Sequence, residues 1–404
     1  MADLMDEAIA RGATADEAEE IALVQLRALG ADLLTDWART RHDESLAAAR
    51  AQHPAASQDS KKKLKWFTTF GPIRIEEQLL RLGRRGVQLR PFCQSARVTH
   101  RGSSRRLQRV VTDFGAESSF MRAAARVREH YGIDVAPSAA RVHTLQHARA
   151  IAGVPAPPAP PAAQLITQMD GGMVPIVEPG QGEDKRQGKK LSWREARLCC
   201  ARESESAHAR YGATLGGVAV TAAVWVQTAH AAGLTAQSRV HGVGDGAPWI
   251  VAQFQEQFGS QGAYLVDFYH VSQYLAAAAP SMARPGKEAA WRRRQQGRLL
   301  ENKGAGVLRS LEARLEPEGQ EEAPVRAAWR YLKERRAHLD YAGARARELP
   351  IGSGEVEGGH RSVVQARLKL SGCWWREQNA QAMLQLRVAR ANNLWDRYWS
   401  TAKN

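Results

Sequence analysis

The stretch from residue 164 to about residue 283 constrains the fold most, because its hydrophobic pattern changes period several times in a set order. Short runs of apolar and β-branched residues indicate strands, and longer amphipathic or alanine-rich runs indicate helices. In chain order these patterns predict strands at 165–179, 194–204 and 208–217, a helix at 218–233, a strand at 239–247, a helix at 248–259, a strand at 262–270 and a further helix. This succession predicts an α/β domain.

The same order of elements is that of the ribonuclease-H-like fold. Its three leading strands form a meander, because they are joined by short connections such as the polar loop GQGEDKRQGKK at 180–190. Residues 271–348 interrupt the order with a long helical stretch that is rich in arginine. We therefore predict a ribonuclease-H-like catalytic domain at 164–404 with an all-α insertion at about 271–348.

Two further regions precede this domain. Thr14 and Glu17 have the spacing of a capping box ahead of an amphipathic pattern, which predicts one long helix or two within an N-terminal arm at 1–55. The next region, 56–150, begins with a lysine run at 61–63, which taken by itself fits a solvated linker. The stretch LKWFTTFGPIRIEE that follows predicts a pair of short strands. Residues 151–163, IAGVPAPPAPPAA, predict an extended linker and a domain boundary.

The segment 118–150 has a helix, break, helix pattern that predicts a helix-turn-helix or, equally by pattern, an ordinary helical hairpin. In a helix-turn-helix the second helix enters the major groove and its first residues meet base edges, while neighbouring arginines contact phosphates. The candidates for base contact are Ser138, Arg141 and Thr144. The candidates for phosphate contact are Arg126 and Arg128.

The net charge of +15 favours a polyanionic partner, with nucleic acid ahead of a membrane surface. The sequence contains no run of eighteen apolar residues and no secretion leader, so we expect a cytoplasmic, nucleoid-associated protein without membrane contact. Its four cysteines show no CxxC spacing, which argues against a zinc site or a disulfide framework. We expect reduced cysteines, most of them in the core.

Three acidic residues stand where an α/β sheet places its functional crevice. Asp170 ends an apolar strand before two glycines, and Asp245 follows a second strand within Gly244-Asp245-Gly246. The third, Glu357, opens an amphipathic helix after Gly352-Ser353-Gly354. Each Asp-Gly pair alone is also a common turn, so the prediction of a site depends on the three acids together.

Helix phase decides between the two glutamates of this helix. Glu357 is in line with Val364 and Leu368, whereas Glu355 is about 200° away from it, so we expect Glu357 on the buried face and Glu355 toward solvent or DNA. A buried carboxylate needs a cationic partner, either a metal ion or Arg361 four residues on.

Three carboxylates suit a hard cation such as Mg²⁺ or Mn²⁺, which takes oxygen ligands and leaves positions for water and phosphate. A pair of such ions can stabilise the attacking and leaving oxygens of a displacement at phosphorus without a protein nucleophile. The residues alone thus favour metal-dependent chemistry on DNA.

The order DGGMV, GDGAPWI, LVDFYHVSQYL and LPIGSGEVEGGHRSVVQARLKLSGCWW resembles the DDE transposases of bacterial insertion sequences, specifically the ISKra-type group related to Mutator-like elements. The resemblance covers most of residues 60–400, and the GSG-x-VE motif is its most specific part. It implies that Asp170, Asp245 and Glu357 form the catalytic triad. It also implies that Asp267 and His270 form a D-x-x-H motif whose histidine assists near the scissile phosphate; without the resemblance, the same two residues fit a cap at a strand end.

Further basic and aromatic residues follow the third acid. Arg361, Arg367 and Lys369 are candidates for the DNA side of this helix, or for plain solvated charge. Trp374 and Trp375 fit either base stacking or the core, and we expect at least one of them in the core.

The leading hypothesis is an enzyme: a transposase that binds the terminal inverted repeats of its element as a homo-oligomer and cuts and joins double-stranded DNA, including a target. The main alternative is a non-catalytic DNA-binding protein or repressor derived from a transposase. A small-molecule enzyme with an acidic pocket fits neither the charge nor the arginine-rich stretch.

Overall fold

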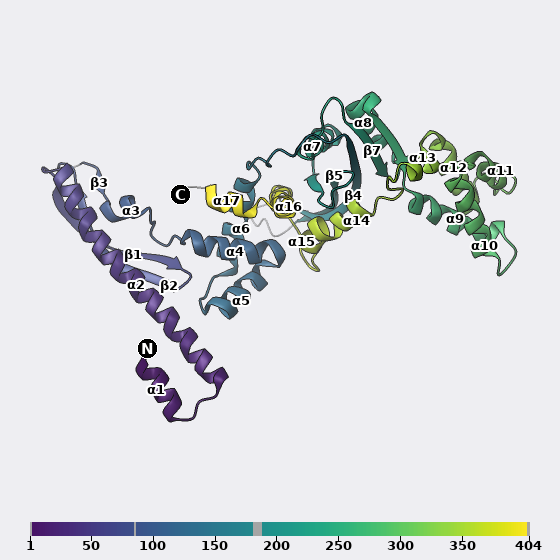
Figure 1. Cartoon of the computed structure of the whole chain (residues 1–404). Coiled ribbons are helices and arrows are strands. Elements are labelled where there is room, and N and C mark those ends of the chain that lie inside the picture. Colours follow the sequence, from purple (N-terminus) through teal and green to yellow (C-terminus); the bar gives the residue numbers. More distant parts are fainter. Residues whose placement is uncertain (1, 85, 181–187, 402–404) are drawn as a thin grey trace. The chain divides into compact units, whose positions relative to one another are not determined.

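The computed structural model describes residues 2–84, 86–180 and 188–401, which form two compact units (Figure 1). One unit contains residues 1–147 and 399–404, and the other contains Ala148–Tyr398. Residues 152–163, within the predicted linker, contain neither helix nor strand. Most of the predicted polar loop at 180–190 lies outside the described residues.

The first unit begins with helices α1 (Ala2–Ala10) and α2 (Ala15–Gln52). Thr14 and Glu17 form the predicted capping box, in which each side chain accepts a hydrogen bond from the other residue's backbone N–H. The predicted strand pair is also confirmed, as β1 (Ser57–Thr68) and β2 (Gly71–Arg81), with a short β3 (Gln88–Leu89) beside β2. The lysine run at 61–63 belongs to β1, so its interpretation as a linker is wrong.

The small sheet buries one face, because its apolar residues alternate along each strand. Leu64 and Trp66 of β1 lie opposite Ile75 and Ile73 of β2, and these side chains pack with Ala38 of α2. Helix α3 (Pro91–Ala96) adds Phe92 to this core.

Three helices complete the first unit: α4 (Arg105–Glu117), α5 (Phe120–Tyr131) and α6 (Pro137–Ile151). The predicted helix, break and helix at 118–150 correspond to α5 and α6, whereas α4 was not predicted. Gly132 ends α5 at φ 64°, a left-handed conformation that glycine adopts without steric cost.

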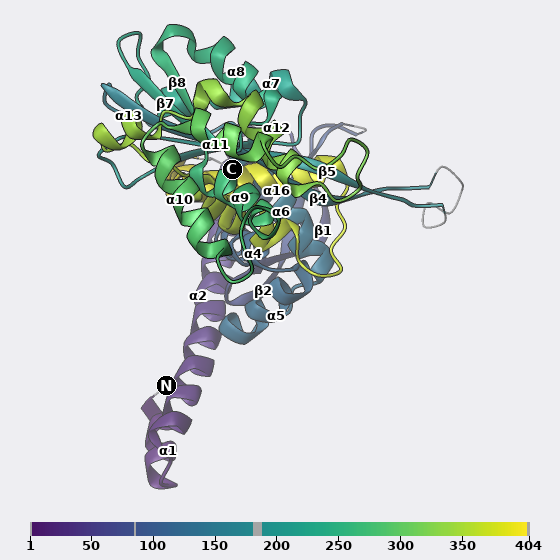
Figure 2. The same cartoon turned by 90° about the vertical axis from the view of Figure 1, so that its right-hand side faces the viewer.

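The second unit is a mixed α/β domain around a five-stranded sheet of order β6-β5-β4-β7-β8. The strands have the predicted order along the chain: β4 (Gln164–Glu178), β5 (Lys190–Glu203), β6 (Arg210–Thr214), β7 (Arg239–Gly244) and β8 (Gly262–Val266). The first three form an antiparallel meander, and β7 and β8 run parallel to β4. In Figure 2, β4 and β5 continue past the shorter strands as a two-stranded ribbon.

Helices cover both faces of this sheet. Thr167 of β4 accepts a hydrogen bond from Trp225 of α7 (Val218–Ala231), and Trp225 packs against Phe254 of α8 (Pro248–Phe258). The next residue, Gln168, points to the opposite face, where it meets Val356. That face carries α14 (Gly354–Gly359), a π-helical turn (His360–Gln365), α15 (Ala366–Leu368) and α16 (Glu377–Ala391); α17 (Trp395–Thr401) follows.

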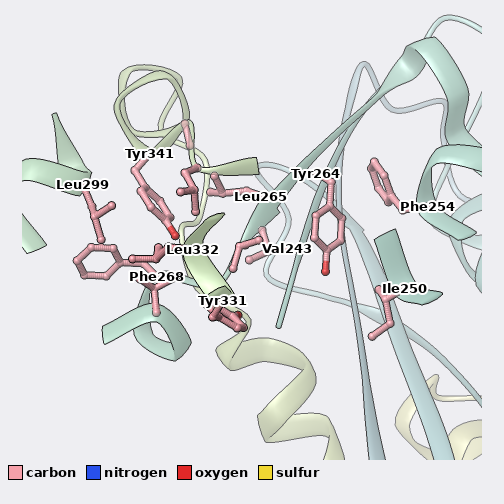
Figure 3. Packing of buried hydrophobic residues seen from close by; sticks show 14 of the residues in the cluster. Val243, Ile250, Phe254, Tyr264, Leu265, Phe268, Leu299, Tyr331, Leu332 and Tyr341 are labelled. Carbon is pink, nitrogen blue, oxygen red and sulfur yellow. The ribbon is translucent and has the colours of Figure 1, made fainter. Parts of the chain in front are cut away.

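The stretch between β8 and α14 is helical, as predicted. It consists of α9 (Phe268–Met282), α10 (Glu288–Leu300), α11 (Gly304–Glu312), α12 (Pro324–Glu334) and α13 (Tyr341–Ala346). Figure 3 shows that its core is continuous with that of the sheet: Phe268, Tyr331 and Tyr341 pack in the same cluster as Val243 and Leu265. In the part of the chain that the structure describes, no helix is long and apolar enough to cross a membrane.

Candidate active site at the strand ends

Asp170 of β4 lies beside Asp245, the residue that directly follows the neighbouring parallel strand β7. Gln168 of β4 pairs with Val243 of β7, so two residues further along each strand Asp170 is level with Asp245. The close approach of Gly244 to the carbonyl of Met169 agrees with this register. The sequence predicted that these two carboxylates lie together, and the structure brings them together. The prediction that Asp170 ends its strand is wrong, because β4 continues through Gly171 and Gly172 to Glu178 in its pairing with β5.

The loop after β7 fixes the direction of Asp245. Its Oδ1 accepts a hydrogen bond from the backbone N–H of Ala247 at 2.8 Å. Gly246 has φ 73°, and helix α12 holds this turn from the other side: Tyr331 donates to the carbonyl of Asp245, and Arg335 donates to that of Gly246. The helical stretch therefore supports the candidate site directly.

Burial raises the pKa of the Asp170 carboxyl above its ordinary value. His360 and the Gly171 N–H lower this pKa, and the neighbouring Asp245 carboxylate raises it further. The Asp170 side chain is still 38% exposed, so a ligand can reach it. A site with two adjacent carboxylates, one partly removed from water, favours a bound cation or a bound proton.

The pKa shift predicts how Asp170 affects stability. Because the folded protein holds the Asp170 proton more tightly than the unfolded chain does, this group favours folding below its ordinary pKa of 3.8, and the benefit is lost as the pH rises through the raised value. Asp170→Asn is thus expected to raise the unfolding temperature relative to wild type at neutral pH and to leave it unchanged in acid. Thermal melts over a pH series, with exposed Asp6→Asn as the control, measure this difference. Equal pH profiles for wild type and Asp170→Asn would contradict the shift.

His360 is a candidate site residue that the sequence did not predict. It is 3% exposed, and its Nε2 donates a hydrogen bond to the carbonyl oxygen of Asp170 at 3.0 Å and lies 3.8 Å from Oδ2 of the same residue. Its Nδ1 is buried and has no hydrogen-bond partner among the described residues. The only sequence signal is a single histidine after Gly358-Gly359, which no spacing rule singles out.

Two glycines let the helix of His360 approach the sheet. A Cβ on Gly172 would lie 2.9 Å from Nδ1 of His360, and a Cβ on Gly359 would lie 2.7 Å from the ring of Tyr211. A Cβ on Gly358 meets nothing within 4 Å.

This contrast gives a matched pair of substitutions. Gly359→Ala is expected to lower the free energy of unfolding by about 1 to 3 kcal/mol through overpacking against Tyr211. Gly358→Ala is expected to raise it by about 0.5 to 1 kcal/mol, because alanine is the better helix former and nothing blocks its methyl group. Urea denaturation of both variants measures the two effects, and destabilisation by both would show that the contact with Tyr211 does not decide the outcome.

The expectation that Glu357 lies on the buried face is wrong. Glu357 is exposed, whereas Glu355 is half-buried and forms an ion pair with Arg202 of β5 at 3.1 Å. The cause is the π-helical turn that starts at His360, because one extra residue in a turn displaces the following side chains by about 100°. The phase of Val364 and Leu368 therefore does not extend back to Glu357.

The helix of Glu357 nevertheless lies beside Asp170 and Asp267. Ser353 and His360, about one turn before and after it on the same side of the helix, touch Asp267 and Asp170 respectively. No hydrogen bond or ion pair engages the Glu357 carboxylate within the described ranges. Gln168 fixes the start of this helix by accepting a hydrogen bond from the N–H of Val356 at 2.9 Å.

Asp267 is buried, with 2% exposure, and its carboxylate is fully engaged. It accepts hydrogen bonds from the N–H groups of Tyr269 and His270 as the cap of α9, and from the N–H and hydroxyl of Ser353 before α14. These contacts give Asp267 a positioning role. His270 is half-buried beside Tyr274 and Tyr331, and it is one of the groups that lower the pKa of the Asp170 carboxyl.

The donor set fits a magnesium or manganese ion held by two carboxylates. No three His, Cys, Asp or Glu side chains among the described residues are close enough together to hold a metal ion. Mg²⁺ commonly keeps several waters and takes one or two carboxylates together with substrate phosphate oxygens, so Asp170 and Asp245 match this mode.

The predicted DNA contacts on α5 and α6 are exposed, with one exception. Ser138, Arg141, Arg126 and Arg128 are exposed. Thr144 is 0% exposed, and its hydroxyl donates to the carbonyl of Ala140, so its prediction as a base contact is wrong. The reason is α4, whose Gly115 packs directly against Thr144.

The basic and aromatic residues that follow Glu357 also include both exposed and buried side chains. Arg361 and Lys369 are exposed, but Arg367 is 1% exposed and its guanidinium lies over the ring of Trp375 at 4.7 Å, so the prediction that it lines a DNA surface is wrong. Trp375 is buried, as expected for one of the two tryptophans, and Trp374 is 42% exposed. Cys199 and Cys200 are also in the core, as expected.

Fold and site together define a mixed α/β domain in which Asp170, in the middle of β4, is level with Asp245, the residue that follows β7. Residues 223–400 match the profile of an uncharacterised protein family, UPF0236. The matched region contains Asp245, Asp267, His270, Glu357 and His360, and it excludes Asp170. No curated protein matches the chain.

Proposed function

We propose that this chain is a DNA transposase that binds the terminal inverted repeats of a mobile element and catalyses metal-dependent cleavage and transfer of DNA strands. The observation that carries the proposal is the pair Asp170 and Asp245, level on adjacent parallel strands, beneath the helix of Glu357 and His360. The DDE-type motifs in the sequence supply the expected order of these acids.

The proposed fold of the catalytic domain is ribonuclease-H-like. The strand order β6-β5-β4-β7-β8, with an antiparallel meander followed by two parallel strands, supports this assignment. So does the position of α14 on the face toward which Asp170 points. The helices α9 to α13 correspond to the proposed insertion.

In this proposal Asp170 and Asp245 hold Mg²⁺ or Mn²⁺, with Glu357 as the third acid. The bound ion would supply Lewis-acid stabilisation of charge at the scissile phosphate. His360 holds the backbone of Asp170, and Asp267 joins the end of β8 to the start of α14, so both keep the acids in place. His270, at the first turn of α9, acts electrostatically on Asp170 and is able to donate a proton to a phosphate or a leaving oxygen.

The DNA surface in this proposal includes the exposed residues of α5 and α6 and, beside the site, Arg361 and Lys369. The net charge of +15 supports binding to the DNA backbone. Several protomers on one DNA complex would bring two element ends together.

The proposal predicts that the purified protein cuts a duplex carrying the end of its own element. Cleavage is expected with Mg²⁺ or Mn²⁺ and is expected to cease in EDTA, because the acids alone leave the developing charge at phosphorus unbalanced. Denaturing gels of end-labelled duplexes measure the products, and a scrambled duplex is the control. Binding to the end without cleavage under any metal condition would instead favour a DNA-binding protein or repressor derived from a transposase.

A further inference from the structure

The first unit contains a groove of about 950 Å³ that the predicted DNA contacts do not include. Side chains of α2, β1, β2 and the segment 100–101 line it. Two of these elements, β1 and β2, are the paired strands of one hairpin, and α2 packs against that hairpin beside the groove. The groove therefore has a floor of paired strands, which keeps its shape fixed.

Basic side chains dominate the groove. Lys63 and Lys65 lie two residues apart on β1 and so share one face, and Arg74 lies opposite Lys65 on β2. Arg101 and Arg39 add two more cations from the rim. The acids in the lining are Asp43 and Glu76, so positive charge is in excess.

The backbone at the rim is held in place. Arg101 donates its N–H to the carbonyl of Lys65 at 2.6 Å, and Phe67 donates its N–H to the carbonyl of Gly102 at 2.9 Å. Arg101 adopts φ 60°, a conformation that is uncommon for residues other than glycine. The backbone that carries the Arg101 side chain is thus fixed beside the lysines.

These cations are available to a ligand. Within the part of the chain that the structure describes, Lys63, Lys65, Arg74 and Arg101 form no ion pair. The ammonium of Lys65 lies 4.7 Å from the centre of the half-buried Phe67 ring, which leaves that ring covered. The groove offers charge and little surface for stacking an unpaired base.

We propose that this groove binds the sugar-phosphate backbone of double-stranded DNA and supplies affinity that does not depend on sequence. Lys63 and Lys65 are about 6.7 Å apart along the strand, and DNA phosphates advance about 3.4 Å along the axis per nucleotide of each strand, so such a row reaches more than one phosphate. A single small anion would leave most of the row unused. This inference rests on the proposed function, because it assigns a DNA surface to the same protein.

The test measures binding of the full chain to fluorescent duplexes over a series of KCl concentrations. Lys63→Glu/Lys65→Glu is compared with Arg11→Glu/Arg84→Glu, which changes the net charge equally at exposed positions outside the groove. The groove variant is expected to bind about tenfold or more weakly at low salt. Its salt slope is expected to fall by about 2, because each of the two lysines no longer neutralises a phosphate. Element-end and random duplexes should be affected alike.

Lys63→Gln/Lys65→Gln separates the removal of attraction from added repulsion and is expected to show the same fall in slope. Equal weakening in the groove and control variants would overturn the inference, because net charge alone would then explain it. If wild type cuts the element end while the groove variant binds like the control, only the groove assignment fails. If wild type binds no duplex at all, both the groove and the proposed function fail.

Discussion

Asp245→Asn is expected to lower the rate of metal-dependent strand cleavage by about three orders of magnitude or more, the scale seen when one member of a catalytic group that acts as a unit is removed. Asparagine keeps the size of the side chain and can still accept the hydrogen bond from Ala247, so the loop after β7 should retain its shape. What it removes is a charge beside Asp170, which the proposed function assigns to the binding of a divalent cation.

Single-turnover cleavage of an element-end duplex measures this effect, and binding of the same duplex should be unchanged. Glu256→Gln, which neutralises an exposed acid on α8, is the matched control and should cut at the wild-type rate. Cleavage by Asp245→Asn at the rate of this control would remove Asp245 from the site.

The same cleavage assay also tests the two glutamates of α14, Glu355 and Glu357. Glu357→Gln is expected to reduce cleavage on a scale similar to Asp245→Asn. Glu355→Gln is expected to leave most of the cleavage and to lower the free energy of unfolding by about 1 kcal/mol, because Arg202 loses its ionised partner in a half-buried place. The reverse pattern would make Glu355 the catalytic acid and Glu357 a surface residue.

Asp267→Ala is expected to produce the largest loss of stability, about 4 kcal/mol. The carboxylate is buried and accepts four hydrogen bonds, and each donor left without an acceptor costs about 1 kcal/mol or more. The same substitution removes the N-terminal cap of α9. Urea denaturation followed by circular dichroism and tryptophan fluorescence measures the change.

Two further variants define the source of that loss. Ser353→Ala removes only the hydroxyl donor and is expected to have a much smaller effect than Asp267→Ala. Asp134→Ala removes a carboxylate that is 88% exposed and should leave stability nearly unchanged. If Asp267→Ala were no more destabilising than Asp134→Ala, the carboxylate would not be holding α9 and α14 together.

The sequence predicted the order of strands and helices in the second unit because each element there has a clear period and a clear boundary. The pairing of Asp170 with Asp245 followed from that order, since the ends of parallel strands meet at one edge of a sheet. Thus two acids far apart in the chain could be placed together without any structural information.

The remaining site features depend on contacts that sequence periodicity does not contain. The π-helical turn at His360 shifted the phase on which the burial of Glu357 was predicted. Thr144 and Arg367 have the residue types of DNA contacts, but Gly115 and Trp375 cover them. His360 was missed because a lone histidine has no spacing signal. Its contact with the sheet depends on Gly172 of β4, which is far from it in the sequence.

The contact between Asp267 and Ser353 holds together the two ends of the segment that contains helices α9 to α13. The chain leaves the sheet at Asp267 and returns to the same point at Ser353, where Phe268 also donates its N–H to the carbonyl of Ile351 at 2.9 Å. The segment from α9 to α13 therefore begins and ends at the same place beside the sheet. Residues inserted or removed between α10 and α11 would therefore leave Asp267 and the start of α14 in place, whereas changes in α12 would reach the site through the hydrogen bonds of Tyr331 and Arg335 to the Asp245 turn.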